Sequence, residues 1–358
     1  MNILYLNNDM TIGGVSKCIL KLTKGFKNNN NIFIASKSNG VLLPEFERMG
    51  IKNIDLGDID DKSPKNVLKN IFIIKKAVEK YNIDIIHSHH RMTTLLAKIV
   101  SKLVKVKVIH TQHLCINDKY KLTKIALNNI KVITVSDAAK RILVEKSNLR
   151  SEDITTIYNA IETQSENKVI DEQLTNLKEK GYFVVSQISR IVDYKGVYDF
   201  IEIAKAVSEV NDHIKFVLIG DGCEYNNISE QIERENLGNI VYLLGPKDNV
   251  IEHLKKIDVV LLCSYIEGLP LAPIESFSQG VPVIATDIDG TNEEIIDGYN
   301  GYLVKKKDIG AFKKDIIKLY EDKDLYSNMK ENCINIFKNK FNEKIYYKKH
   351  SNMYLMKK

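Results

Sequence analysis

The stretch IDVVLLCSYIEGLPLAPIESFSQGVPVIATDIDGTNEEIIDGYNG, residues 257–301, contains the pattern that decides the fold. Within it, residues 258–263 form a short run of Val and Leu, typical of a strand buried on both faces of a parallel sheet. A loop with prolines follows at 264–273, then a helix from about Ile274 to Gly280 and a second apolar strand at 281–286. This order predicts an open α/β sheet, in which ligands bind at the carboxyl ends of the strands.

Two carboxylates lie eight residues apart at this strand end, Glu267 in the loop and Glu275 near the start of the helix. A helix dipole favours an acidic residue in its first turn by roughly 0.3–1 kcal/mol, which is one alternative reason for Glu275 taken alone. It does not explain Glu267, because this residue lies in a loop constrained by Pro270 and Pro273. Carboxylates accept hydrogen bonds from hydroxyls, and free helix N–H groups bind anions. The stretch therefore suits a ligand that has both hydroxyl groups and an anionic group, such as a nucleotide sugar.

A basic pair lies at another predicted strand end, where YFVVSQISRIVDYKG, residues 182–196, passes from a strand towards a helix. Arg190 and Lys195 are five residues apart. The Arg190 guanidinium is a planar fork of hydrogen-bond donors, and the Lys195 ammonium is a compact point charge. Together they suit two phosphates, because a charge-assisted hydrogen bond contributes about 1.5–3 kcal/mol. Surface pairs of basic residues are common, so this pair gains weight from its position one crossover away from the two carboxylates.

The two patterns together resemble the retaining glycosyltransferases of the GT-B fold (glycosyl transferases group 1, glycosyltransferase family 4). The E-x7-E spacing, the R-x4-K spacing and the GVPVIAT run at 280–286 carry the resemblance, which extends over almost the whole chain. It implies an α/β protein with two Rossmann-like domains facing across a cleft. We expect an acceptor-binding domain at 1–165, a donor-binding domain at 166–340, and a helix at 341–358 that returns to the N-terminal domain.

The resemblance also implies an activity: a hexosyltransferase that moves a sugar, with retention, from a nucleotide diphosphate, taken as UDP, to a saccharide or lipid-linked saccharide. In this scheme Arg190 and Lys195 stabilise charge on the leaving diphosphate, and Glu275 binds the ribose. Glu267 orients the sugar, and His113 matches a family histidine near the sugar. The residues expected to be catalytic are therefore Glu267, His113, Arg190 and Lys195. The leaving phosphate helps to deprotonate the acceptor, so the nucleotide sugar is a co-substrate and no cofactor or metal is required.

Further residues are expected to contact the donor. A glycine pair after the first predicted strand lets the backbone approach a ligand, although a plain tight turn explains it equally well. By resemblance, a loop at a later strand end packs against the base. The predicted donor-binding residues are Gly13, Gly14, Arg190, Lys195, Gly245, Pro246, Lys247, Glu267, Gly268, Leu269, Pro270 and Glu275.

Four histidines, His87, His89, His90 and His113, fall at the ends of two neighbouring predicted strands. A hydrogen-bonded core histidine is the ordinary interpretation of any one of them, and no acidic or cysteine residue has the spacing of a zinc ligand. Their shared position predicts that His89 and His90 contact the acceptor. The pair at 287–289 resembles a D-x-D metal motif but follows a different strand, so we expect a turn there and no metal site.

The basic residues are concentrated in the N-terminal half. Residues 1–165 contain 26 Lys and Arg and 15 Asp and Glu, a net charge of +11, and the remainder carries −5. This charge suits an anionic membrane surface, a pyrophosphate-linked acceptor or nucleic acid, and a lysine-rich composition from an A/T-biased genome explains it as well. We expect the first two partners and no nucleic acid. Five scattered cysteines, with neither a signal peptide nor an apolar run of ~20 residues, predict a cytoplasmic protein that could rest on the inner face of the cell membrane.

Other functions remain open at this point. A nucleotide-sugar epimerase or a phosphorylase could use the same fold, and a non-catalytic partner could bind saccharide as a subunit. Such a partner would typically have lost one of the two basic or two acidic groups, and all four are present. An NAD-dependent oxidoreductase is disfavoured because the G-x-G-x-x-G fingerprint is absent. The family suggests synthesis of bacterial cell-surface polysaccharide, such as capsule, exopolysaccharide or lipopolysaccharide.

Overall fold

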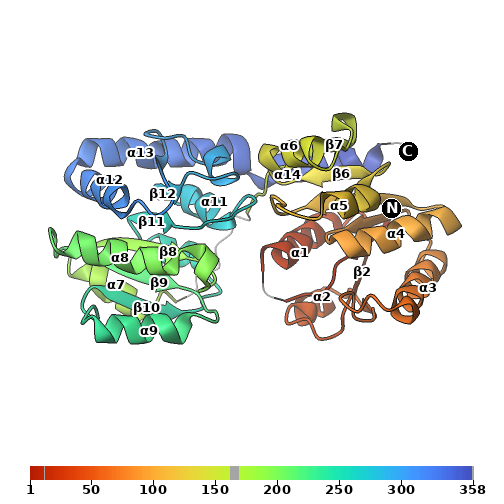
Figure 1. The fold of residues 1–358 in the computed structure, drawn as a ribbon, viewed down its shortest axis with the longest axis horizontal. Coiled ribbons are helices and arrows are strands. Elements are labelled where there is room, and N and C mark those ends of the chain that lie inside the picture. The colour runs from red at the N-terminus through yellow and green to blue at the C-terminus, as the bar shows by residue number, and fades with distance from the viewer. Residues whose placement is uncertain (12, 162–168, 357–358) are drawn as a thin grey trace. The chain divides into compact units, whose positions relative to one another are not determined.

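A computed structural model describes residues 1–11, 13–161 and 169–356, and two compact units can be followed in it (Figure 1). Unit 1 comprises Met1–Asn159 with Lys344–Lys358, and unit 2 comprises Ala160–Glu343. The units therefore meet in sequence at Asn159, whereas the predicted boundary at 165–166 lies outside the described residues. Each unit is an α/β structure with a parallel sheet, which confirms the predicted class of fold.

Unit 1 is built on a seven-stranded sheet in the order β3-β2-β1-β4-β5-β6-β7. Its strands are buried by helices, which is why segments such as β1 are continuous apolar runs. The strands are β1 (Asn2–Leu6), β2 (Asn31–Ser36), β3 (Asn53–Asp55), β4 (Ile85–Ser88), β5 (Lys107–Gln112), β6 (Lys131–Thr134) and β7 (Ile154–Thr156). The helices are α1 (Gly14–Phe26), α2 (Leu43–Arg48), α3 (Pro64–Lys80), α4 (Arg91–Leu103), α5 (Tyr120–Leu127), α6 (Asp137–Glu145), η1 (Ser151–Asp153) and, after unit 2, α14 (Glu343–Leu355).

Helix α14 is bound to the core of unit 1 by its last turns. The Tyr354 hydroxyl shares hydrogen bonds with His87 Nδ1 at 2.9 Å and with the Tyr5 hydroxyl at 3.3 Å. Lys107 Nζ donates to the Met353 carbonyl at 2.7 Å, so a cation lies where the dipole of the helix is negative. The C-terminal helix is therefore an integral part of unit 1.

Unit 2 is built on a six-stranded sheet in the order β10-β9-β8-β11-β12-β13. The strands are β8 (Phe183–Ile188), β9 (Ile214–Ile219), β10 (Val241–Gly245), β11 (Val259–Leu262), β12 (Val283–Thr286) and β13 (Gly301–Val304). The helical segments are α7 (Glu172–Glu179), η2 (Asp193–Lys195), α8 (Val197–Ser208), α9 (Tyr225–Arg234), α10 (Val250–Leu254), α11 (Leu271–Ser278), η3 (Thr291–Glu293), α12 (Ile309–Glu321), α13 (Lys323–Ile336) and the π-helical turn η4 (Phe337–Phe341). The strand order reverses between β8 and β11, which is the switch point where ligands bind in such sheets.

The helix after the opening loop begins earlier than the sequence predicts. Helix α11 starts at Leu271 and not near Ile274, because Pro273 lies inside its first turn. Proline is tolerated there, since the first turn does not need its N–H and the ring fixes a helical φ. Glu275 consequently lies in the second turn, where the helix dipole has little effect, so the dipole no longer explains this residue.

None of the helices within the described ranges combines the length and the apolar character that a transmembrane span needs.

Candidate functional site

A buried ion pair lies at the switch point of unit 2. Lys195 Nζ is 2.5 Å from Glu267 Oε1, and the side chains are only 16% and 6% exposed. Lys195 follows β8 and Glu267 follows β11, which are neighbouring strands of the sheet. The structure thus brings together one member of the predicted basic pair and one of the predicted acids.

Close packing of glycine holds Lys195 beside β11. Gly196 has a φ of +66°, and a Cβ at this position would lie 2.1 Å from the Cys263 carbonyl oxygen. The backbone of the β8 loop can approach the end of β11 only because residue 196 has no side chain. Gln187 Nε2 also donates to the Lys195 carbonyl at 2.9 Å, which fixes the backbone of Lys195 as well.

We expect Gly196→Ala to destabilise unit 2 and to displace Lys195 from Glu267. A non-glycine residue in a left-handed conformation costs about 1–3 kcal/mol, and the contact with Cys263 adds to this cost. The measurement is urea unfolding together with donor hydrolysis. Gly181→Ala is the matched control, because Gly181 has a φ of +80° but nothing within 4 Å of its Cβ position. Equal losses in the two variants would show that the close approach to Cys263 is unimportant.

Tyr194 connects the two predicted basic residues. The exposed Arg190 guanidinium donates to the Tyr194 hydroxyl. Arg190 Cζ and Lys195 Nζ each lie 5.7 Å from the centroid of the Tyr194 ring. A cation over an aromatic face is stabilised by about 0.5–1 kcal/mol at an exposed site. Tyr194 was not predicted as a site residue, although its position directly before Lys195 was an available signal.

The rest of the acidic loop is packed into unit 2. Leu269 is buried, Pro270 is the extended residue before α11, and Glu275 is half-buried in that helix. Gly268 abuts the loop after β12, because a Cβ on Gly290 would lie 2.5 Å from the Gly268 carbonyl oxygen. The loop that carries Glu267 is therefore held in place on the side of β12.

The predicted base-binding loop follows β10. Gly220 N donates to the Gly245 carbonyl at 3.0 Å, so the ends of β9 and β10 are joined. Pro246 follows, and Lys247 Nζ forms an ion pair with Asp171 Oδ2 at 2.8 Å. Since Asp171 is the N-cap of α7, the Lys247 side chain is directed to that helix, and its contact with a donor remains a prediction.

The predicted glycine pair lies at the start of α1 in unit 1. Gly13 is the N-cap residue of α1 and Gly14 its first residue. A Cβ at either position would meet nothing within 4 Å. Packing inside unit 1 therefore does not require glycine here, which leaves room for a ligand close to the backbone.

The predicted acceptor histidines, His89 and His90, follow β4 in unit 1, and the predicted catalytic His113 follows the neighbouring β5. His89 Nδ1 and His113 Nε2 share a hydrogen bond of 2.9 Å. His90 is the N-cap residue of α4. Among the described residues, nothing bonds to the buried Nε2 of His89 or to the buried Nδ1 of His90. These two ring nitrogens are available to a ligand that can reach them.

His87 is a structural residue, because Tyr354 and Thr111 occupy both of its ring nitrogens. It belongs to a set of five that we call the histidine cluster, of which His113 is half-buried and the others are buried: His87, His89, His110, His113 and His350. Burial lowers the pKa of His113 to about 3 and the pKa values of His110 and His350 to about 4. Burial also lowers the pKa values of His87 and His89 well below the ordinary value of histidine. The cluster is therefore uncharged at neutral pH.

Within the described residues, no group of three or more His, Cys, Asp or Glu side chains is suited to hold a metal ion. Asp287 and Asp289 lie in the connection between β12 and η3, and Asp287 N donates to the Val304 carbonyl at 2.7 Å. This segment is the turn that the sequence predicts.

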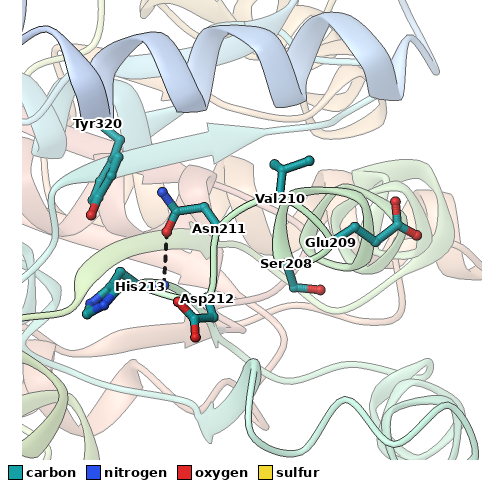
Figure 2. A pocket seen from close by; sticks show the side chains of 7 residues that line it. All are labelled: Ser208, Glu209, Val210, Asn211, Asp212, His213 and Tyr320. Atoms are coloured by element: carbon teal, nitrogen blue, oxygen red, sulfur yellow. Dashed lines mark hydrogen bonds between the residues drawn. The ribbon is translucent and has the colours of Figure 1, made fainter.

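A shallow pocket in unit 2 lies at the opposite edge of the sheet (Figure 2). It is formed by the end of α8, the residues before β9, and a tyrosine of α12. The lining residues are Ser208, Glu209, Val210, Asn211, Asp212, His213 and Tyr320. Since this is the amino-terminal edge of the strands, the pocket is separate from the loops that carry Lys195 and Glu267, and we assign it no role.

Two Rossmann-like units, with opposite charges gathered at the switch point of the second, define the GT-B class of α/β enzyme fold. The crystal structure of Anabaena HepE in complex with UDP has the same fold, with a TM-score of 0.85 at 19% identity over 99% of both chains. The models described as "Glycosyl transferases group 1" and "Glycosyltransferase Family 4" match residues 170–335 and 12–165.

Two curated relatives agree with these matches. "Uncharacterized glycosyltransferase MJ1178" of Methanocaldococcus jannaschii is 31% identical over 269 residues, which is 72% of this chain and 71% of that protein. "UDP-Gal:alpha-D-GlcNAc-diphosphoundecaprenol alpha-1,3-galactosyltransferase" of Escherichia coli is 29% identical over 296 residues, 77% of this chain and 76% of that protein. The chain belongs to this glycosyltransferase family and is an enzyme of that kind.

Proposed function

We propose that the enzyme transfers a sugar from a UDP-sugar to a saccharide or lipid-linked saccharide, with retention, in the synthesis of a bacterial cell-surface polysaccharide. The observation that carries the proposal is the buried Lys195–Glu267 pair at the switch point of unit 2. The names of the relatives support it, since HepE was crystallised with UDP and the E. coli relative uses UDP-Gal and a diphosphoundecaprenol-linked acceptor.

Opposite charges at the ends of two neighbouring strands suit the two halves of a nucleotide sugar. The Lys195 ammonium has three donors, so it can keep Glu267 and also bind a phosphate oxygen. Arg190 would bind the other phosphate, and the two cations would stabilise charge that builds up on the leaving diphosphate. Glu267 would accept hydrogen bonds from the sugar hydroxyls, and Glu275 from the ribose. This chemistry needs no metal, because the two side chains supply the positive charge.

The acceptor would be bound by unit 1. The buried Nε2 of His89 and the buried Nδ1 of His90, which have no hydrogen-bond partner in the described part of the chain, support this assignment. Since burial keeps His89 and His113 uncharged, they would contact acceptor or sugar hydroxyls through hydrogen bonds and not as cations. The charge needed for a pyrophosphate-linked acceptor would then come from lysine and arginine on the surface of unit 1.

The test is a panel of nucleotide sugars scored by thermal shift and by donor hydrolysis. We expect UDP-sugars to raise the melting temperature in proportion to the logarithm of their concentration. With a lipid-linked saccharide acceptor, NMR of the product should show the anomeric configuration of the donor. Epimerised nucleotide sugar without transfer would favour the epimerase, and saccharide binding without any turnover would favour the non-catalytic subunit.

We further propose that unit 1 rests on the anionic inner face of the cell membrane. Helix α4 packs between α3 and α5 on one side of the first sheet (Figure 1). The three helices contain ten basic residues and one acidic residue. They also expose Leu68, Phe72, Leu103 and Ile125, each between 58% and 65% accessible. Apolar side chains among lysines are the surface that anionic lipid attracts.

Co-sedimentation with vesicles tests this surface without measuring transfer. We expect binding to vesicles that contain phosphatidylglycerol, weakened several-fold by Phe72→Glu, and little binding to phosphatidylcholine alone. Val210→Glu is the matched control, because Val210 is similarly exposed, at 59% against 65% for Phe72, but lies in unit 2. Equal sedimentation of the two variants, or equal binding to both kinds of vesicle, would exclude this surface.

A further inference from the structure

The Arg190 guanidinium is held by a neutral side chain and not by an acid. It donates to the Tyr194 hydroxyl, and its Cζ lies 5.7 Å from the centroid of the Tyr194 ring. Within the described part of the chain, no carboxylate forms an ion pair with Arg190, whereas Lys195 is paired with Glu267. A phenol hydroxyl can accept from a guanidinium without cancelling its charge. The positive charge of Arg190 therefore remains available to an anion.

The backbone around Arg190 is fixed by the loop after β9. Ile191 N donates to the Asp221 carbonyl at 2.8 Å. Gly220 has a φ of +149°, and a Cβ at this position would collide with the Ser189 carbonyl oxygen. Only glycine permits this approach of the two loops. The origin of the Arg190 side chain is thus set by the fold, and the direction of its guanidinium is set by Tyr194.

Tyr194 is in turn anchored to the loop that carries Glu267. Tyr265 N, in that loop, donates to the Tyr194 carbonyl at 2.9 Å. The Tyr265 hydroxyl donates to Asp199 Oδ2 of α8 at 2.9 Å, so the anchor is itself held on both of its sides. The Tyr194 side chain remains 36% exposed. It can therefore face a ligand while its backbone is kept in place.

We propose that Tyr194 is a positioning residue for Arg190: its hydroxyl and its ring hold the guanidinium in the orientation that binds a phosphate of the donor. This inference rests on the proposed function, in which Arg190 and Lys195 bind the diphosphate. The guanidinium has five N–H donors, so its contact with one hydroxyl leaves others for phosphate oxygens. A side chain that is oriented in advance loses less rotamer freedom when the ligand binds, and the ligand is bound more tightly.

Two substitutions of Tyr194 separate its hydroxyl from its ring. Tyr194→Phe keeps the ring and removes the acceptor, whereas Tyr194→Leu removes both. We expect the Kd of UDP, measured by calorimetry, to rise about fivefold in Tyr194→Phe and about tenfold, or roughly 1.4 kcal/mol, in Tyr194→Leu. Tyr242→Phe is the matched control, because it removes a hydroxyl that donates to the Asn239 carbonyl at the start of β10. It should leave the Kd unchanged.

A double-mutant cycle shows whether the hydroxyl acts through Arg190. Arg190→Met should itself weaken UDP binding, and in that background Tyr194→Phe should have no further effect, because the guanidinium that it positions is gone. A purely structural role of Tyr194 would give equal losses in both backgrounds and a lower urea midpoint. We expect the urea midpoint of Tyr194→Phe to equal that of the wild type.

The same titrations with inorganic pyrophosphate test the cations without the base and the sugar. Unchanged affinity for UDP and pyrophosphate in Tyr194→Phe would overturn the proposal. Tighter binding would also overturn it, since the hydroxyl would then compete with phosphate for Arg190. Unchanged affinity in Arg190→Met would overturn it together with the role of Arg190 in the proposed function. If the wild type binds pyrophosphate but not UDP, the proposed nucleotide is wrong and the pyrophosphate series decides the role of Tyr194. Binding of neither would overturn both proposals.

Discussion

Lys195→Met is expected to reduce sugar transfer by at least two to three orders of magnitude and to lower the stability of unit 2. Removal of one preorganised donor that stabilises developing charge costs about 10²–10³ in rate. The stability loss has a separate cause, because the variant leaves Glu267 buried without its cation. Breaking a buried ion pair from one side typically costs about 3–5 kcal/mol.

The double variant Lys195→Met/Glu267→Gln separates these effects. With both charges removed, no uncompensated carboxylate remains, so most of the lost stability should return while transfer stays abolished. Stability is measured by urea unfolding, and transfer by release of UDP in the presence of acceptor. Persistent instability in the double variant would mean that the pair holds the fold through packing and not through charge.

The ion pair Lys178–Asp258 supplies the control. Its atoms are 2.6 Å apart with side chains 26% and 18% exposed, and it lies at the start of β11, away from the site edge. Lys178→Met should therefore reduce stability but leave transfer per folded molecule unchanged. Near wild-type transfer in Lys195→Met would remove Lys195 from the site altogether.

Mild acid is expected to unfold unit 1. The histidine cluster has folded pKa values below the unfolded value of 6.5, so the unfolded chain binds protons first as pH falls. Stability is complete above pH 6.5 and is lost progressively down to the folded pKa values, about 4 for His110 and about 3 for His113. Each such histidine contributes about 1.4 kcal/mol per pH unit in this window, against a total stability of about 5–15 kcal/mol for a domain.

Circular dichroism during urea unfolding at pH 7.5, 6, 5 and 4.5 measures this loss. His110→Asn should flatten the profile below pH 6.5, although the substitution itself reduces stability at pH 7.5 because Thr94 loses a partner for its hydroxyl. His213→Asn, in unit 2, should leave the profile as it is in the wild type. Constant stability from pH 7.5 to pH 4.5 would show that the cluster is accessible to water and protons.

The features that the sequence predicts well are those governed by local rules. Parallel strands buried on both faces leave unbroken apolar runs, and their carboxyl ends mark the edge where ligands bind. These two rules are sufficient to predict that Lys195 and Glu267 lie at the same edge of the second sheet, as they do. The predicted start of α11 was wrong by about one turn, since Pro273 is equally compatible with a loop and with a first helical turn.

Other features depend on contacts that no local pattern records. Glu293 and Glu294 are neighbours at the end of a short 3-10 segment, and periodicity does not indicate which of them is buried. The hydrogen bond between Tyr354 and His87 joins residues 267 positions apart, so neither sequence neighbourhood reveals it. The assignment of α14 to unit 1 came from the family resemblance and not from the residues of the helix itself.

The place of α14 in unit 1 has a consequence for synthesis on the ribosome. Domains usually fold in the order in which they are translated. Here Tyr346, Met353 and Tyr354 fill the core of unit 1 but are made only after the whole of unit 2. Unit 1 therefore waits, with part of its apolar core uncovered, until the residues of unit 2 have been made. Chaperones that hold nascent chains are expected to engage the N-terminal half for most of that time.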